Sequence, residues 1–145
     1  MIAELAKKSG ASYVAMTKIN DYKLAPAKKA SYVNDFFDSN DADVIGNLVE
    51  ASHGGFDIAF EVVGGENTLD TCIHAVKPGG NVIMIGNSIT EKIPVNINRA
   101  VLQEVNLIGS VSCTREEFTG TIELIAEGII TPEQYVTDIV SLDEL

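Results

Sequence analysis

Two carboxylates within an apolar run are the first candidates for chemistry. Asp57 and Glu61 lie four residues apart in the run of residues 56–63. On a strand this spacing places both side chains on one face, where paired carboxylates can serve as general acid and base. The sequence places neither a nucleophile nor a metal-ligand pattern beside them. We therefore favour structural roles, a loop cap or an ion pair with a basic side chain, over catalysis.

The cysteines and histidines form no metal-binding pattern. Cys72 and Cys113 are far apart and belong to no C-x-x-C motif, and neither His53 nor His74 stands at metal-ligand spacing from them. Cys72 falls on the apolar face of a predicted helix, where a free thiol packs as a small hydrophobic side chain. The sequence therefore predicts no zinc site in this chain.

Glycines that close two apolar runs indicate nucleotide binding. Residues 56–63 are followed by Gly64 and Gly65, and residues 82–85 are followed by Gly86. The segment between them has apolar residues at helical spacing, namely Leu69, Cys72, Ile73 and Val76. This order predicts a strand, a crossover helix and a parallel strand, with both strands buried on both faces. Glycines at the carboxyl ends of parallel strands let a ligand approach the backbone.

The ordered set of these residues resembles the cofactor-binding domain of medium-chain, zinc-dependent alcohol and polyol dehydrogenases. The likeness is greatest to the sorbitol, threonine and butanediol dehydrogenase branch. It rests on Asp57, Glu61, Val63-Gly64-Gly65, Lys77-Pro78-Gly79-Gly80 and Ile85-Gly86. The resemblance implies an α/β fold with a Rossmann-like, doubly wound parallel sheet. It also implies NAD or NADP as cofactor and hydride transfer between a secondary alcohol and the nicotinamide.

The resemblance also implies that the domain is incomplete. Residues 1–9 read as a helix, and in the family such a helix follows the first strand and the G-x-G-x-x-G turn that holds the pyrophosphate. We therefore expect residues 1–145 to be a single, partial dinucleotide-binding domain. We expect the chain to lack the first strand and the glycine-rich turn. We also expect it to lack the separate domain that carries the catalytic zinc. Such a chain should not turn over a substrate alone.

Residues at strand ends are the cofactor contacts that the resemblance implies. The residues expected to contact the adenosine half of the coenzyme are Lys18, Ile19 and Lys23. The residues expected along the nicotinamide are Ile85, Gly86, Asn87, Ser110, Val111 and Ser112, and Val63 and Gly64 are further expected cofactor contacts. The family has an acidic residue at the position of Lys18, where it accepts hydrogen bonds from the ribose. An ammonium group instead attracts a 2′-phosphate, so NADP is a candidate coenzyme as well as NAD. The alternative is that Lys18 is only a solvated residue at the end of a strand.

The rest of the chain is expected to alternate strands and helices. Further strands are predicted at residues 12–17, 30–33, 105–111 and 135–140. Further helices are predicted after a cap at Ser39 or Asp41, over residues 99–103, after the capping box opened by Thr114, and from residue 142 onward. Phe118, Ile122 and Ile125 should face inward. The segment from Ile93 to Ile97 is expected to be an edge strand, because Pro94 lacks a donor, and the resemblance implies that it pairs with a second copy in a homo-oligomer.

Composition excludes some classes of protein. The chain has 145 residues, of which 46% are hydrophobic and 21% charged, as in an ordinary globular domain. Its net charge of −11 opposes binding to nucleic acids or anionic membranes. Neither a signal peptide nor an apolar span is evident, so a cytoplasmic location is expected.

Two alternatives to the dehydrogenase reading are open at this point. Methyltransferases that use S-adenosylmethionine also place Lys-Pro-Gly-Gly before an apolar strand, although they usually end in an antiparallel hairpin. The other alternative is a non-catalytic remnant that acts only in assembly, through the segment from Ile93 to Ile97.

Overall fold

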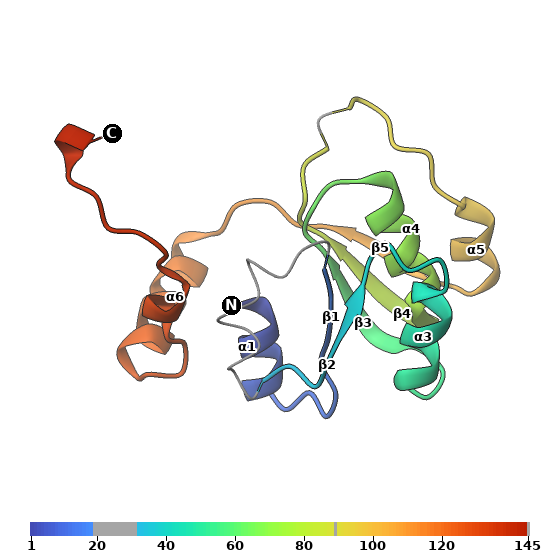
Figure 1. Cartoon of the computed structure of the whole chain (residues 1–145), viewed down its shortest axis with the longest axis horizontal. Helices are drawn as coiled ribbons and strands as arrows, with labels where there is room; N and C mark the ends of the chain where they lie inside the picture. Colours follow the sequence, from blue (N-terminus) through green and yellow to red (C-terminus); the bar gives the residue numbers. More distant parts are fainter. Residues whose placement is uncertain (19–31, 89, 145) are drawn as a thin grey trace. The chain divides into compact units, whose positions relative to one another are not determined.

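The computed structural model describes residues 1–18, 32–88 and 90–144, with the side chains of Lys18 and Glu144 excepted. The chain divides into two compact units. The first unit joins Met1–Phe36 to Cys113–Leu145, and the second unit is Phe37–Ser112. Figure 1 shows both units in the colours of the sequence. None of the described helices is long and apolar enough to span a membrane.

The first unit combines both ends of the chain. It contains α1 (Ile2–Lys8), β1 (Ala15–Lys18), α6 (Arg115–Ala126) and two short 3-10 helices, η2 (Pro132–Tyr135) and η3 (Leu142–Glu144). β1 pairs with β2 (Asp35–Asp38), which crosses the boundary between the units. The predicted capping box is confirmed, because the Thr114 side chain accepts from the Glu117 N–H and the Glu117 carboxylate accepts from the Thr114 N–H.

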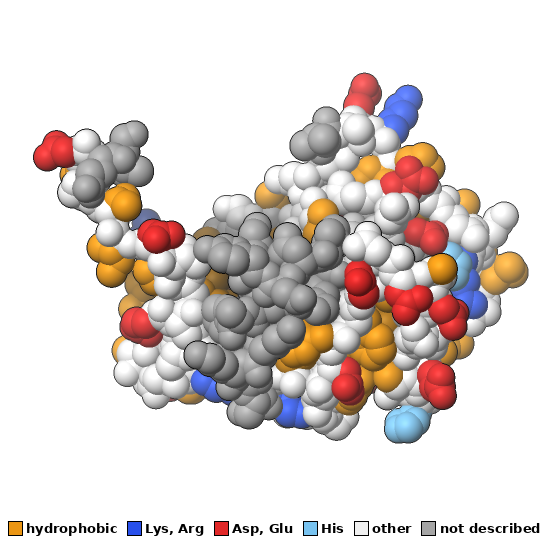
Figure 2. Space-filling view, in the orientation of Figure 1, with side chains coloured by type: hydrophobic (Ala, Val, Ile, Leu, Met, Phe, Trp, Pro, Cys, Tyr) orange, Lys and Arg blue, Asp and Glu red, His pale blue; other side chains and the backbone are white. Residues whose placement is uncertain are grey.

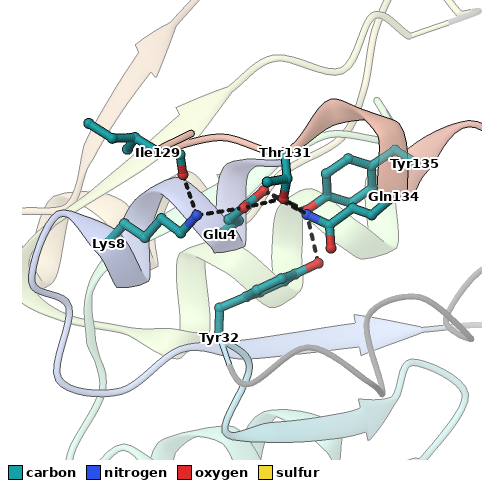
Figure 3. Close-up of polar contacts among 7 residues, drawn as sticks. All are labelled: Glu4, Lys8, Tyr32, Ile129, Thr131, Gln134 and Tyr135. Carbon is teal, nitrogen blue, oxygen red and sulfur yellow. Dashed lines mark hydrogen bonds and ion pairs between the residues drawn. The ribbon is translucent and has the colours of Figure 1, made fainter. Parts of the chain in front are cut away.

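A buried carboxylate joins α1 to the carboxyl-terminal segment of the first unit. Glu4 is only 1% exposed. Its carboxylate accepts hydrogen bonds from Lys8 Nζ at 2.9 Å, Thr131 Oγ1 at 3.0 Å, Tyr135 OH at 3.0 Å and Gln134 Nε2 at 3.2 Å (Figure 3). Burial alone raises the pKa of Glu4. The hydrogen bonds from Lys8, Tyr135 and Thr131 and the charge of Lys8 outweigh it, so the pKa of this carboxyl lies below its usual value.

The second unit is a three-stranded parallel sheet with helices. Its elements are α3 (Val44–Ala51), β3 (Phe56–Glu61), α4 (Glu66–Ala75), β4 (Val76–Met84), α5 (Ile97–Leu102) and β5 (Asn106–Gly109). The strand order is β3-β4-β5, and both neighbouring pairs are parallel. α4 is the predicted crossover helix between β3 and β4 (Figure 1).

One face of this sheet carries the core of the second unit. α4 packs on β3 and β4, and α3 and α5 pack on α4. The buried cluster consists of Leu69, Ile73, Val76, Val82 and Ala100. The alternate side chains of β3, which point to the opposite face of the sheet, remain exposed; Ile58 is 48% exposed and Phe60 is 41% exposed. The expected burial on both faces is therefore wrong for β3, because the contacts within this unit place α4 on the side of Ala59 and Glu61 only.

The Lys77-Pro78-Gly79-Gly80 turn lies inside a strand instead of separating a helix from it. β4 begins at Val76, opposite Phe56, and the next ladder pair is Ile58 with Asn81. The intervening residues therefore form a bulge, in which Gly79 has the left-handed φ of +74° that glycine accommodates without strain. The proline needs no ladder partner in such a bulge.

Two strand predictions fall on segments of other structure. Residues 30 and 31 lie outside the described part, Val33 is in no strand, and the strand forms at β2, where Phe36 and Phe37 supply β propensity. Residues 135–140 are not a strand, because Tyr135 belongs to η2, which Pro132 opens. Residues 142–144 form η3 where a helix was predicted to begin.

Other sequence predictions also need correction. The N-cap of α3 is Asp43 and not Ser39 or Asp41; Asp41 instead accepts the Asp43 N–H at 2.9 Å and shapes the turn before the helix. In α6, Phe118 is 60% exposed and Ile122 is 52% exposed, so these side chains do not face a core.

The expected edge strand from Ile93 to Ile97 is absent from the described sheets. Ile93 and Val95 pack against the core of the second unit. The Asn96 side chain accepts the Arg99 N–H, so Ile97 begins α5. Within the single chain this segment forms no strand, and the homo-oligomer stays a prediction.

Candidate functional site

Three strand ends of the second unit lie at the same edge of its sheet. Glu61 pairs with Met84 in the ladder, and Met84 pairs with Gly109. Because the strands are parallel, the chain leaves all three at the carboxyl edge, where open α/β sheets bind ligands. The structure thus brings together the cofactor contacts that the sequence predicts at these strand ends, which are Val63, Gly64, Ile85, Gly86, Asn87, Ser110, Val111 and Ser112.

Two glycines allow the first two of these segments to touch through their backbones. A Cβ on Gly86 would lie 2.6 Å from the Val63 nitrogen and would also clash with the Gly64 nitrogen. A Cβ on Gly64 would lie 2.5 Å from the carbonyl carbon and oxygen of Asn87, and Gly64 also has a φ of +79°. Neither position has room for a side chain. The glycines that the sequence placed at these strand ends are therefore required for the contact.

Hydrogen bonds continue beyond the ends of the strands. The Glu61 carbonyl accepts from the Ile85 N–H at 2.8 Å and from the Gly86 N–H at 3.1 Å. The Ser110 N–H donates to the Met84 carbonyl at 2.9 Å. These bonds fix the backbone of the three segments at the sheet edge.

The two carboxylates of β3 have the structural roles that the sequence favoured. Glu61 is 3% exposed and caps the following loop, accepting from the N–H groups of Val63 at 2.9 Å and Gly64 at 3.0 Å. Asp57 forms an ion pair with Lys77 at the surface. The Lys77 ammonium group holds the pKa of the Asp57 carboxyl below its usual value.

Apolar side chains surround the carboxyl edge. Val63 is 61% exposed and Val111 is 85% exposed, and Ile85 is also exposed between them in the strand order. Exposed aliphatic side chains beside ordered main-chain groups suit a flat, amide-bearing ring, which needs apolar contacts on its face and a few hydrogen bonds at its rim. The edge therefore presents exposed apolar side chains beside ordered main-chain groups.

The residues predicted for the adenosine half are only partly described. Lys18 is the last residue of β1, in the first unit, and its side chain lies outside the described part. Ile19 and Lys23 also lie outside the described residues. The adenosine contacts therefore stay a prediction.

The described side chains do not fit a zinc ion. Over residues 1–18, 32–88 and 90–144, no group of three or more His, Cys, Asp or Glu side chains is placed to hold a metal. Cys72 lies on α4, half-buried against the core, and Cys113 is exposed. No catalytic step through a metal follows from these residues.

We expect Cys113 to react with iodoacetamide more than about tenfold faster than Cys72 at pH 8, because the thiolate is the reactive form. Burial, together with the nearby charge of Glu61, raises the pKa of the Cys72 thiol to about 12. Peptide mass mapping over a time course measures both rates, and labelling in urea shows that both thiols are intact. Equal rates in the folded protein would contradict the described burial of Cys72.

Comparison with known proteins identifies the family. A family model described as zinc-binding dehydrogenase matches residues 1–127. The (R,R)-butanediol dehydrogenase of Neisseria gonorrhoeae is 26% identical over 146 residues, a match that covers 100% of this chain and 40% of that protein. The chain thus spans about 40% of the length of the curated relatives it matches.

Solved structures share the fold. The crystal structure of 2R,3R-butanediol dehydrogenase from Bacillus subtilis matches with a TM-score of 0.82 at 23% identity, covering 94% of this chain and 38% of that one. A zinc-binding dehydrogenase from Sinorhizobium meliloti 1021, solved with NADP bound, matches with a TM-score of 0.79 at 21% identity, covering 93% of this chain and 40% of that one. These matches confirm the resemblance and the α/β fold class. The chain belongs to the zinc-binding dehydrogenase family and has the mixed α/β architecture of its Rossmann-like domains.

Proposed function

We propose that this chain is the coenzyme-binding part of an NAD(P)-dependent, zinc-dependent alcohol or polyol dehydrogenase. Residues 1–145 would form one partial dinucleotide-binding domain of that enzyme. The observation that carries the proposal is the meeting of three parallel strand ends, with Gly64 and Gly86 in backbone contact, in a chain of this family. Family membership favours this function over a methyltransferase.

The residues of the second unit would bind and orient the nicotinamide. The ring would lie against Val63, Ile85 and Val111, and main-chain groups of residues 85–87 and 110–112 would hold its carboxamide. A bound nicotinamide supplies the carbon that accepts or donates the hydride. The side chains described here offer no zinc ligands, so polarisation of the alcohol would depend on another part of such an enzyme.

Lys18 is the residue that we expect to distinguish the two coenzymes. Its ammonium group would attract the 2′-phosphate of NADP and cannot accept hydrogen bonds from the ribose of NAD. NAD is the alternative if Lys18 is only a solvated strand end. On the face shown in Figure 2, acidic side chains are spread widely and basic ones are scattered.

A fluorescence titration of the purified chain with NADH and NADPH tests the proposal. We expect saturable binding of at least one coenzyme, and a preference for NADPH that weakens in moderate salt because phosphate contacts are screened. The Lys18→Ala variant should lose this preference, while Lys92→Ala, a change at an exposed lysine of the second unit, should keep it. Failure of both coenzymes to bind at millimolar concentration would overturn the proposal. A homo-oligomer and a cytoplasmic location stay predictions.

A further inference from the structure

Glu61 is the residue that connects the separate segments of the carboxyl edge. Its side chain accepts from the N–H groups of Val63 and Gly64 in the loop after β3 and from Thr68 Oγ1 in α4, at 2.7 Å. Its main-chain carbonyl accepts from residues 85 and 86 at the end of β4. One buried residue therefore sets the distance between the loop, the helix and the neighbouring strand end.

The Glu61 carboxylate also lies where an anion is most favourable. α4 begins at Glu66, and its N-cap, Gly65, provides no side-chain cap. The N–H groups that precede and open a helix, together with its dipole, attract anions such as the phosphates of a nucleotide. Here the carboxylate already takes the N–H groups of Val63 and Gly64. A coenzyme phosphate would meet a buried negative charge and two occupied donors.

We propose that Glu61 is a positioning residue of the coenzyme site. It holds the turn of Val63 and Gly64 against Gly86 and Asn87, so that the edge keeps the shape that the nicotinamide requires. Its buried carboxylate, bonded to Thr68 in the first turn of α4, also disfavours phosphate groups beside this turn and leaves the edge to the nicotinamide ring. The inference rests on the proposed function and adds to it a residue with a specific role.

The Glu61→Gln variant tests this role with two ligands. Glutamine keeps the size of the side chain but removes the charge, and it replaces one acceptor oxygen, such as the Oε2 that accepts from the Gly64 N–H, by an NH₂ group. ADP-ribose has the adenosine, pyrophosphate and second ribose of NADH but lacks the nicotinamide. By calorimetry, we expect the affinity for NADH to fall about tenfold, as for loss of a charge-assisted bond, and that for ADP-ribose to change less than about twofold. Asp57→Asn removes the same charge from an exposed position of β3 and should change neither affinity.

Amide hydrogen exchange of the free protein gives a second measurement that does not require a coenzyme. In Glu61→Gln, protection of the Val63 and Gly64 amides should fall at least about tenfold, while that of Val82 in the core should persist. The Thr68→Val variant removes one donor to the carboxylate without changing the size of the side chain. It should lose less NADH affinity and less amide protection than Glu61→Gln, and it replaces that variant if the glutamine protein does not fold.

The outcomes separate this inference from the proposed function. If the wild-type chain binds neither NADH nor ADP-ribose, the proposed function is overturned, and the coenzyme role of Glu61 with it. If the wild-type chain binds and both ligands weaken equally in the variant, or if the Val63 and Gly64 amides keep their protection, only the role of Glu61 is overturned. A selective loss of NADH together with faster exchange at these amides supports it.

Discussion

The Gly86→Ala variant is expected to destabilise the second unit by about 3 kcal/mol, at the upper end of the usual cost of overpacking. The new Cβ would lie 2.6 Å from the Val63 nitrogen and 2.7 Å from its carbonyl carbon. These atoms belong to the backbone, which cannot move aside as a flexible side chain can. Relief requires the strand ends to separate, and the bonds from residues 85 and 86 to the Glu61 carbonyl would then be lost.

Gly109→Ala is the matched control for this prediction. Gly109 ends β5 at the same edge, but a Cβ there would meet no atom within 4 Å, and its φ is not in the left-handed region. Its replacement should leave stability unchanged or raise it by up to about 1 kcal/mol, because alanine restricts the unfolded chain. Urea denaturation followed by circular dichroism, with amide exchange in β3 and β4, measures both variants. Equal stability of the two would contradict the close backbone contact.

The Glu4→Ala variant is expected to destabilise the first unit by about 3 kcal/mol, because several donors would together lose a buried, ionised acceptor. The carboxylate accepts from Lys8 of its own helix and from Thr131, Gln134 and Tyr135 of the carboxyl-terminal segment. Amide exchange in α1 and urea denaturation measure the loss. Glu133→Ala, an exposed change in the same 3-10 helix as Tyr135, is the control and should have little effect.

This carboxylate should also make the first unit sensitive to acid. The pKa of Glu4 is lowered in the folded state, so folding favours its ionised form. The stabilisation is complete above the pKa of an unfolded glutamate, about 4.3, and is lost as the pH falls through the lower pKa of the folded state. The stability difference between the wild type and Glu4→Gln should therefore shrink over that range. A difference that is constant from pH 7 to pH 3 would contradict the lowered pKa.

The sequence was most informative where the chain is locally determined. Apolar spacing in α4, glycines at the ends of β3 and β4, and the Thr114 capping box each depend on neighbouring residues, and each was predicted correctly. The meeting of the predicted cofactor contacts of the second unit at one sheet edge followed from the parallel order of the strands. The family comparison agrees with the resemblance that these residues carry.

The wrong predictions concern tertiary surroundings. An apolar face on α6 or β3 indicates what a segment tends to bury, and only the packed structure shows whether another element covers it. The polar residues around Phe36 and Phe37 concealed a strand, and the β propensity of residues 135–140 predicted a strand where Tyr135 instead bonds to Glu4. The contacts of Glu4 with residues 131–135 could not be read from the sequence, because the partners are more than 120 residues apart.

The arrangement of the two units imposes an order on synthesis and folding. The second unit is one continuous stretch, Phe37–Ser112, so a growing chain can complete its sheet as soon as β5 has emerged. The first unit must wait, since the acceptor at Glu4 is made before its donors at residues 131–135. Until then the Glu4 side chain remains in water. Bringing Glu4 and residues 131–135 together closes a long loop, which costs conformational entropy, and the folded second unit within that loop reduces this cost. A ribosome-bound chain stalled before Thr131 should therefore have a folded second unit while the contacts of Glu4 in the first unit are not yet made.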